Sequence, residues 1–189
     1  MTEKRLKAAA SRLFFALWPD DPLRESLRHS TRKAIRASGG RPVPPHNLHV
    51  TLAFLGSVAD ADRAGVAAAA VKVREPAFRF TLDELKVWPR AKTLVLAPGT
   101  ASAELARLYS QLWDGLEETG FAREARPFRP HVTLARKVAT PGKMTLAAPI
   151  EWRADAFALV RSITDPAGAQ YKVIRRWALQ GESPQGPGR

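Results

Sequence analysis

The chain has 189 residues, no cysteine and a formal net charge of +12. An apolar share of 45% is ordinary for a globular domain, and no apolar run is long enough for a membrane-spanning helix. The absence of cysteine excludes a disulfide framework and thiolate chemistry, and the charged amino-terminal stretch does not read as a secretory signal. We therefore expect a cytoplasmic, monomeric protein. It should form one domain over residues 12–179, with flexible tails at 1–11 and 180–189.

The positive charge favours a polyanionic partner, of which RNA or DNA is the obvious candidate. A solvated basic surface without a partner would give the same excess. Charge alone does not decide between the two, because contacts to phosphates position a ligand without reading its identity.

Apolar patterning predicts short strands that alternate with amphipathic helices. Asp21 followed by Pro22 is typical of a capped helix start, and Gly39 and Gly40 close that helix. Helices are expected in three segments that carry apolar residues at helical spacing or are rich in alanine: 22–38, 60–73 and 105–119. Strands are expected at 12–18, 78–82, 85–87, 93–97, 157–160 and 171–179.

One tetrapeptide, His-Val-Thr-Leu, occurs twice, at residues 49–52 and 131–134. Both copies are rich in β-branched and apolar residues and are expected to form strands. Because side chains alternate along a strand, each copy presents its histidine and its threonine on one face and its apolar residues on the other. Two such strands side by side would place two imidazoles and two hydroxyl groups around one cleft.

Strict alternation puts Phe54 and Arg136 on the apolar faces of these strands. We expect Phe54 to pack in the core, with base stacking as the alternative. Arg136 is a candidate to bind phosphate or stack on a base if it lies past a twist or at the strand end. His46 precedes His49 by three residues, but no cysteine and no nearby carboxylate completes a zinc site. No metal and no other cofactor is expected.

Four stretches extend the repeated tetrapeptide into a wider pattern: LFFA at 13–16, NLHVTLAFLG at 47–56, RPFRPHVTLAR at 126–136 and YKVIRRWAL at 171–179. These stretches resemble the 2H phosphoesterase superfamily, and within it the RNA 2′,3′-cyclic phosphodiesterases, historically called 2′-5′ RNA ligases. The resemblance covers most of the chain.

This resemblance implies a two-lobed α+β fold, with antiparallel sheets lining a central cleft and helices outside. It implies metal-independent hydrolysis of RNA 2′,3′-cyclic phosphate ends to a 2′-phosphate. In the family the first histidine is the proton donor and the second the proton acceptor. These roles would fall on His49 and His131, respectively.

The residue types suit that chemistry. An imidazole with an ordinary pKa of about 6.5 can be neutral or cationic near neutral pH, so two of them can serve as base and acid. The hydroxyl groups of Thr51 and Thr133 can donate hydrogen bonds to the phosphate oxygens on which charge builds. Arg136 is the further candidate for substrate binding, joined by Phe54 if its ring stacks on a base instead of packing in the core.

Two other functions remain open. The enzyme could act on 2′-5′ linkages or on small cyclic nucleotides, which a competition between substrates would reveal. Alternatively, the fold could serve as a basic RNA-binding module with little turnover. Such a module predicts salt-dependent binding without product.

Overall fold

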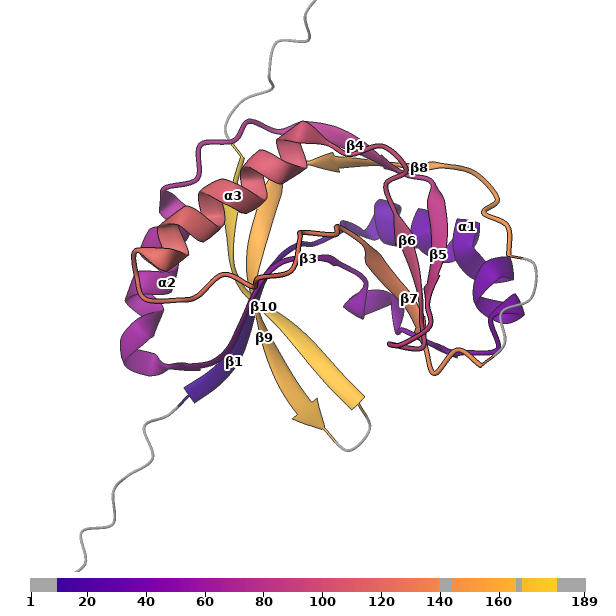
Figure 1. Ribbon diagram of the computed structural model, residues 1–189, viewed down its shortest axis with the longest axis horizontal. Coiled ribbons are helices and arrows are strands. Elements are labelled where there is room, and N and C mark those ends of the chain that lie inside the picture. Colours follow the sequence, from indigo (N-terminus) through magenta and orange to yellow (C-terminus); the bar gives the residue numbers. More distant parts are fainter. Residues whose placement is uncertain (1–9, 140–143, 166–167, 180–189) are drawn as a thin grey trace, which may run out of the picture.

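The computed structural model describes residues 10–139, 144–165 and 168–179 (Figure 1). Its helices are α1 (Asp21–Ala37), α2 (Arg63–Val71) and α3 (Ala103–Glu117), with short 3-10 turns η1 (Pro45–Asn47) and η2 (Asp60–Asp62). Its strands are β1 (Ala10–Leu17), β2 (Arg41–Pro42), β3 (Val50–Ala59), β4 (Phe78–Leu82), β5 (Glu84–Trp88), β6 (Thr93–Ala97), β7 (Val132–Arg136), β8 (Ile150–Ala154), β9 (Ala156–Asp165) and β10 (Gly168–Ala178). The expected α+β class is confirmed.

The main sheet is antiparallel and runs in the order β10-β9-β1-β3-β7-β6-β5, with β2 pairing beside β7. The two central strands, β3 and β7, carry the two tetrapeptides and pair only at Val50 and Val132. The sheet is therefore two half-sheets that meet at the motifs (Figure 1). A separate pair, β4 and β8, forms a second small sheet.

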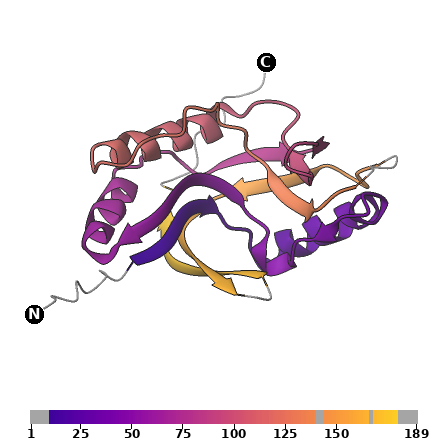
Figure 2. The ribbon, with the colours of Figure 1, turned by 60° about the horizontal axis from the view of Figure 1, so that its bottom comes forward.

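The two halves follow the same order of strand, helix and motif strand. In the first half this is β1, α1 and β3, and in the second half it is β6, α3 and β7. The helices exchange partners, because α3 packs on α2 and β3 whereas α1 packs on β7, β8 and η1 (Figure 2). This exchange ties the two halves together around one core.

The expected amphipathic helix is confirmed in α3, whose leucines at 105, 108, 112 and 116 are buried. The start of α1 differs from the prediction by one residue. Asp20, not Asp21, is the cap, and its Oδ1 accepts a hydrogen bond of 2.9 Å from the backbone N–H of Leu23. Asp21 lies in the first turn, where its charge is also favourable.

The first strand begins at Ala10, two residues before the expected domain boundary, because Ala10 and Ser11 pair with the end of β3. The remaining tail positions, 1–9 and 180–189, lie outside the described residues. Strand β8 was not predicted from the sequence. In the part of the chain that the structure describes, no helix has both the length and the apolar character needed to cross a bilayer.

Candidate active site

Strand β3 carries a β-bulge inside its tetrapeptide. Thr51 and Ala53 pair with consecutive residues of β1, so Leu52 between them is left without a partner in the ladder. An extra residue reverses the alternation of faces, which turns Phe54 to the same side as His49 and Thr51. Phe54 is 41% exposed. The prediction that this ring packs in the core is therefore wrong.

Strand β7 carries the same irregularity at the same position. Thr133 and Ala135 pair with consecutive residues of β6, and Leu134 between them is unpaired. Arg136 thereby joins the face of His131 and Thr133. The expected change of parity before Arg136 is this bulge. The two motif strands thus present His-x-Thr-x-x-Phe and His-x-Thr-x-x-Arg.

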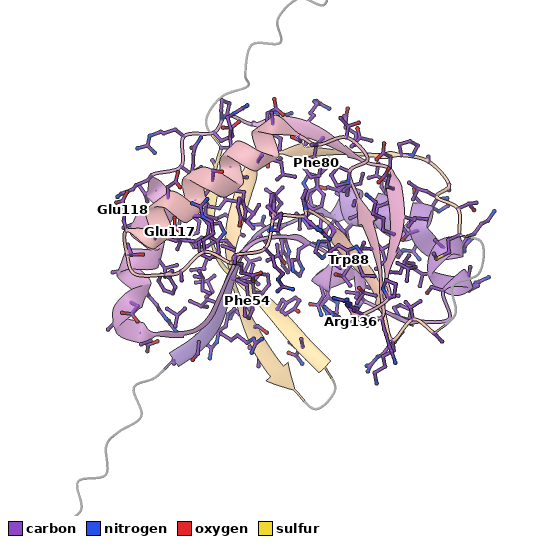
Figure 3. All side chains as sticks on the ribbon, in the orientation of Figure 1. Phe54, Phe80, Trp88, Glu117, Glu118 and Arg136 are labelled. Carbon is purple, nitrogen blue, oxygen red and sulfur yellow. The ribbon has the colours of Figure 1, made fainter. Side chains whose placement is uncertain are left out.

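These two faces line one cavity of about 530 Å³. All six candidate site residues border it: His49, Thr51, Phe54, His131, Thr133 and Arg136. Figure 3 shows Phe54, Trp88 and Arg136 around the middle of the molecule, where β3 and β7 approach each other. The structure therefore brings together the two halves of the site that the sequence places 82 residues apart.

Both imidazoles are held in the same way. The Nδ1 of His49 lies 2.7 Å from the carbonyl oxygen of Asn47, and the Nδ1 of His131 lies 2.7 Å from that of Arg129. A carbonyl only accepts, so each ring carries a proton on Nδ1, and in the neutral ring the lone pair is on Nε2. The Nε2 of His49 is 3.1 Å from the hydroxyl oxygen of Thr51.

His49 is enclosed by aromatic rings. Its ring centroid lies 5.0 Å from that of Phe14, 5.5 Å from that of Trp18 in a stacked arrangement, and 5.4 Å from that of Tyr171. This burial, with smaller repulsive contributions from His131 and Arg136, lowers the pKa of His49 to about 4. The Asn47 carbonyl acts in the opposite direction but does not prevail.

Among the described residues, the aromatic ring in contact with His131 is that of Trp88, at 4.3 Å between ring centroids. Burial lowers the pKa of His131 below its ordinary value, and the positive charge of Arg136 adds to this. Both imidazoles are therefore neutral at pH 7 in the protein without a ligand. An anion in the cavity would favour their protonated forms.

A family model described as the 2′-5′ RNA ligase superfamily matches residues 19–166. The chain belongs to the 2′-5′ RNA ligase superfamily. It is 35% identical to the RNA 2′,3′-cyclic phosphodiesterase of Thermus thermophilus, over 94% of this chain and 96% of that protein. It is 32% identical to the Escherichia coli protein of the same name, over 89% of this chain and 96% of that protein.

Solved structures agree with this membership. The E. coli protein LigT in complex with 3′-AMP superposes with a TM-score of 0.83 and is 31% identical, covering 90% of this chain and 99% of that one. A structure described as a phosphoesterase gives a TM-score of 0.84 at 30% identity, over 91% of this chain and 99% of that one. The family expected from the motifs is confirmed.

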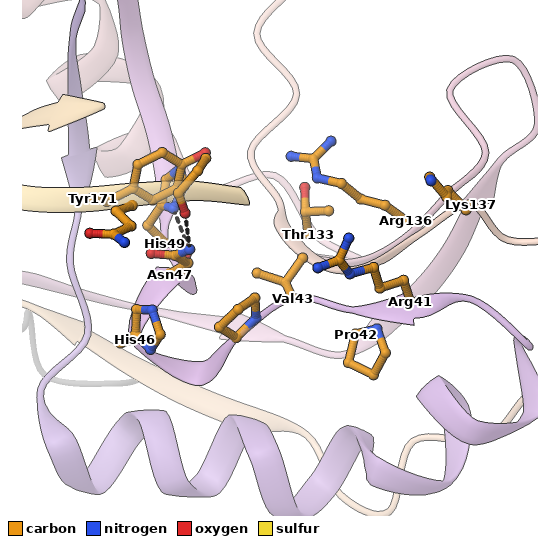
Figure 4. Close-up of a pocket in the computed structure, with 13 residues that line it drawn as sticks. Arg41, Pro42, Val43, His46, Asn47, His49, Thr133, Arg136, Lys137 and Tyr171 are labelled. Carbon is orange, nitrogen blue, oxygen red and sulfur yellow. Dashed lines mark hydrogen bonds between the residues drawn. The ribbon is translucent and has the colours of Figure 1, made fainter. Parts of the chain in front are cut away.

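In this superfamily member, a neighbouring cavity of about 370 Å³ continues the site. Figure 4 shows His49 and Tyr171 on one side of it, with Thr133 and Arg136 on the other. These four residues also line the larger cavity, so the two spaces adjoin at the imidazole of His49. A ligand centred there has room in two directions.

The aromatic shell of His49 and the carbonyls that hold the two imidazoles were not predicted from the sequence. The carbonyls had a usable signal, because Asn47 and Arg129 stand at the same distance before the two histidines. Trp88 gave no such signal, since it reaches His131 only through the pairing of β5 with β6. Thr93 and Arg12 also line the main cavity without any motif to mark them.

Proposed function

We propose that this protein hydrolyses RNA 2′,3′-cyclic phosphate ends to a 2′-phosphate, without a metal ion, using His49 and His131. The observation that carries the proposal is the matched pair of imidazoles. Each is fixed through Nδ1 by a backbone carbonyl two residues earlier, and both border one cavity. The names of the T. thermophilus and E. coli relatives support the same reaction.

The reaction needs one base and one acid. Neutral His131 takes a proton from water through Nε2 as the water oxygen bonds to phosphorus. The bond from phosphorus to the ribose 3′ oxygen breaks, and protonated His49 gives its Nε2 proton to that oxygen. The phosphate stays on the 2′ oxygen, and the two histidines end with their protonation states exchanged. Each group contributes roughly 10²–10⁴-fold to the rate.

His49 must be protonated to serve as the acid, although its pKa is about 4 in the ligand-free protein. The substrate corrects this. A phosphate anion about 4 Å from the ring attracts the imidazolium by about 4 kcal/mol at an effective dielectric constant of 20. Such an attraction is large enough to return the pKa of His49 to the neutral range. Binding of the substrate therefore favours the protonated form of His49, which is the form that acts as the acid.

The assignment of base and acid follows the family and is supported by the surroundings of the two rings. Three aromatic rings enclose His49, whereas the hydrogen bond of His131 to the backbone is exposed. Attacking water reaches the open side more readily. A leaving oxygen that receives a proton away from bulk water is less prone to side reactions.

The remaining candidates bind the substrate. Thr51 and Thr133 donate hydrogen bonds to the non-bridging phosphate oxygens, and Arg136 adds a positive charge beside them. Phe54 offers a ring on which the terminal base stacks. The guanidinium of Arg12 covers this ring at 4.8 Å from its centroid and holds it in place.

The test is an assay with an oligoribonucleotide that ends in a 2′,3′-cyclic phosphate, in the presence of excess chelator. We expect a product with a 2′-phosphate, identified by its resistance to a 3′-specific phosphatase. Absence of product, or product only when metal is added, would refute the proposal. Competition with a 2′-5′-linked oligonucleotide at equal concentration separates the preferred substrate from the alternative.

A further inference from the structure

The sequence around the cleft lacks acidic residues. Three stretches contain no aspartate or glutamate: residues 26–59, 85–103 and 125–150. They supply β2 and β3, nearly all of the β5–β6 hairpin, and β7. Apart from Glu84 at the start of β5, these strands meet without a carboxylate of their own. An anionic ligand would meet attraction along this whole part of the surface.

At one end of these strands, four cations form what we call the basic ridge: Arg41, Arg90, Lys92 and Lys137. Arg136 pairs with Arg41 on one side and with Thr93 on the other, so the ridge crosses β2, β7 and β6. Neighbouring strands lie about 4.8 Å apart, so the ridge spans roughly 10 Å. This is long enough for two or three phosphates of a single strand.

Two residues of the ridge have an unusual backbone. Among the described residues, Lys92 with φ of 49° and Lys137 with φ of 57° are the non-glycine positions in the left-handed region. They lie together, because the N–H of Val138 donates a 3.0 Å hydrogen bond to the carbonyl of Lys92. Glycine or asparagine would adopt this conformation at lower cost. What lysine adds at these positions is a long cationic side chain.

Three cations of the ridge, Arg90, Lys92 and Lys137, also differ from others on the surface. Many arginines and lysines of this chain form ion pairs, such as Lys72 with Glu118 and Arg79 with Glu151. Within residues 10–139, 144–165 and 168–179, no ion pair or hydrogen bond involves the side chains of Arg90, Lys92 or Lys137. Their charge is therefore not offset by a neighbour.

The ridge is continuous with the site. Arg41 and Lys137 border the outer edge of the smaller cavity, and Ala91, between Arg90 and Lys92, borders the larger one (Figure 4). We propose that the basic ridge binds the phosphodiester backbone of the nucleotides that precede the cyclic end. The protein then favours oligoribonucleotides over cyclic mononucleotides. This inference rests on the proposed function for the identity of the end group.

The experiment uses the double variant Lys92→Asn with Lys137→Asn, because asparagine tolerates the left-handed conformation. The matched control is Lys72→Asn with Arg79→Gln, which removes the same charge from the C-terminal end of α2 and from β4. Binding is measured by fluorescence anisotropy with a labelled, unreactive single-stranded oligoribonucleotide between 50 and 200 mM salt. Hydrolysis is measured with a cyclic-phosphate oligoribonucleotide and with a cyclic mononucleotide.

For the ridge variant we expect about tenfold weaker binding and a salt slope reduced by about 1.4, since each contact to a single strand contributes about 0.7. Its kcat/KM should fall by a similar factor on the oligoribonucleotide and stay within twofold on the mononucleotide. Thermal stability should be unchanged or higher. The control should retain the wild-type affinity and slope.

Equal losses in the ridge variant and the control, or an equal loss on both substrates, would overturn the proposal. Unchanged affinity in the ridge variant would do the same. If the wild-type protein hydrolyses neither substrate, the proposed function fails, and the anisotropy measurement still decides whether the ridge binds RNA. The two failures are therefore distinguishable.

Discussion

Leu52 and Leu134, which are left unpaired with β1 and β6 at the two bulges, both have their carbonyl oxygens satisfied by a donor outside those two strands. Leu52 accepts a 3.3 Å hydrogen bond from the indole Nε1 of Trp113, and Leu134 accepts a 2.8 Å hydrogen bond from the backbone N–H of Val43. A buried carbonyl left without a donor costs about 1–3 kcal/mol. These two donors therefore stabilise the bulges that shape the cleft.

Replacing Trp113 by phenylalanine tests this relationship. The variant loses the donor to Leu52 and part of a buried ring, which should destabilise the protein by roughly 2–4 kcal/mol. Relaxation of the bulge should also move His49 and lower kcat by at least about tenfold, since small displacements at a reacting centre are costly. Urea denaturation and steady-state kinetics give the two values.

Trp152→Phe is the matched control for the bulge. Trp152 is as buried as Trp113, but it stacks on Phe80 in the small β4–β8 sheet. It should lose stability without losing turnover. Equal turnover in the two variants would show that the bulge does not depend on the indole.

Phe54 provides a second test, because the bulge places its ring in the cavity. Phe54→Leu should cost less than about 1 kcal/mol of stability, as the residue is 41% exposed and leucine keeps part of the apolar contact. If the ring stacks on the terminal base, KM for a cyclic-phosphate oligoribonucleotide should rise by roughly 5- to 150-fold, because stacking is worth about 1–3 kcal/mol per base. Phe54→Tyr keeps a stacking surface and should retain the wild-type KM. An unchanged KM in the leucine variant would contradict base stacking.

The sequence was sufficient for the parts of the site that depend on local pattern. The repeated tetrapeptide predicted that His49 and Thr51 share one face of their strand. It predicted the same for His131 and Thr133 in the second copy. The bulges were not predictable, because they arise where β1 and β6 pair with the motif strands, and a single strand does not carry its partner's register. The prediction that Phe54 packs in the core was wrong for this reason.

Two other differences have equally specific causes. Adjacent aspartates at 20 and 21 offer the same capping chemistry, so the sequence did not decide which one accepts from the helix. Strand β8 is a short segment whose partner, β4, lies far away in the chain. Its alternation became meaningful only once that partner was known.

The two histidines should each be indispensable. We expect His49→Ala and His131→Ala to lose at least about 10²-fold in kcat, as general acid and base catalysis normally contributes this much. The kcat of the double variant should be only slightly lower than that of the less active single variant, since the two groups are proposed to act in one step. Circular dichroism should show a folded protein in each case. Full turnover in either folded variant would disprove its assigned role.

The pH dependence of the rate should differ between free and bound enzyme. In the proposed mechanism, activity requires protonated His49, whose pKa is about 4, and neutral His131, whose pKa lies below its ordinary value. The bell-shaped pH profile of kcat/KM reports the pKa values of the free enzyme, and it should therefore have its maximum below pH 6.5. The bound phosphate raises both pKa values, so the bell of kcat should peak at higher pH. A kcat optimum at or below that of kcat/KM would contradict substrate loading of His49.

The same lowered pKa makes stability depend on pH. In the unfolded chain His49 takes up a proton below about pH 6.5, whereas in the folded protein it stays neutral down to about pH 4. The unfolded state thus binds more protons in this range, and the free energy of unfolding should fall as the pH drops from 6.5 to 4. The full contribution of this one residue is about 3 kcal/mol, at 1.36 kcal/mol for each unit of pKa difference, and about 2–3 kcal/mol of it is lost by pH 4.5.

His49→Gln isolates that contribution, because glutamine does not titrate and every other group is shared with the wild-type protein. Urea denaturation at pH 7.5 and pH 4.5 gives the free energy of unfolding lost between these pH values, for the wild-type protein and for the variant. We expect the loss to be about 2–3 kcal/mol larger in the wild-type protein than in the variant. Identical losses would mean that His49 is protonated as readily in the folded protein as in the unfolded chain, and that its aromatic enclosure by Phe14, Trp18 and Tyr171 does not lower its pKa.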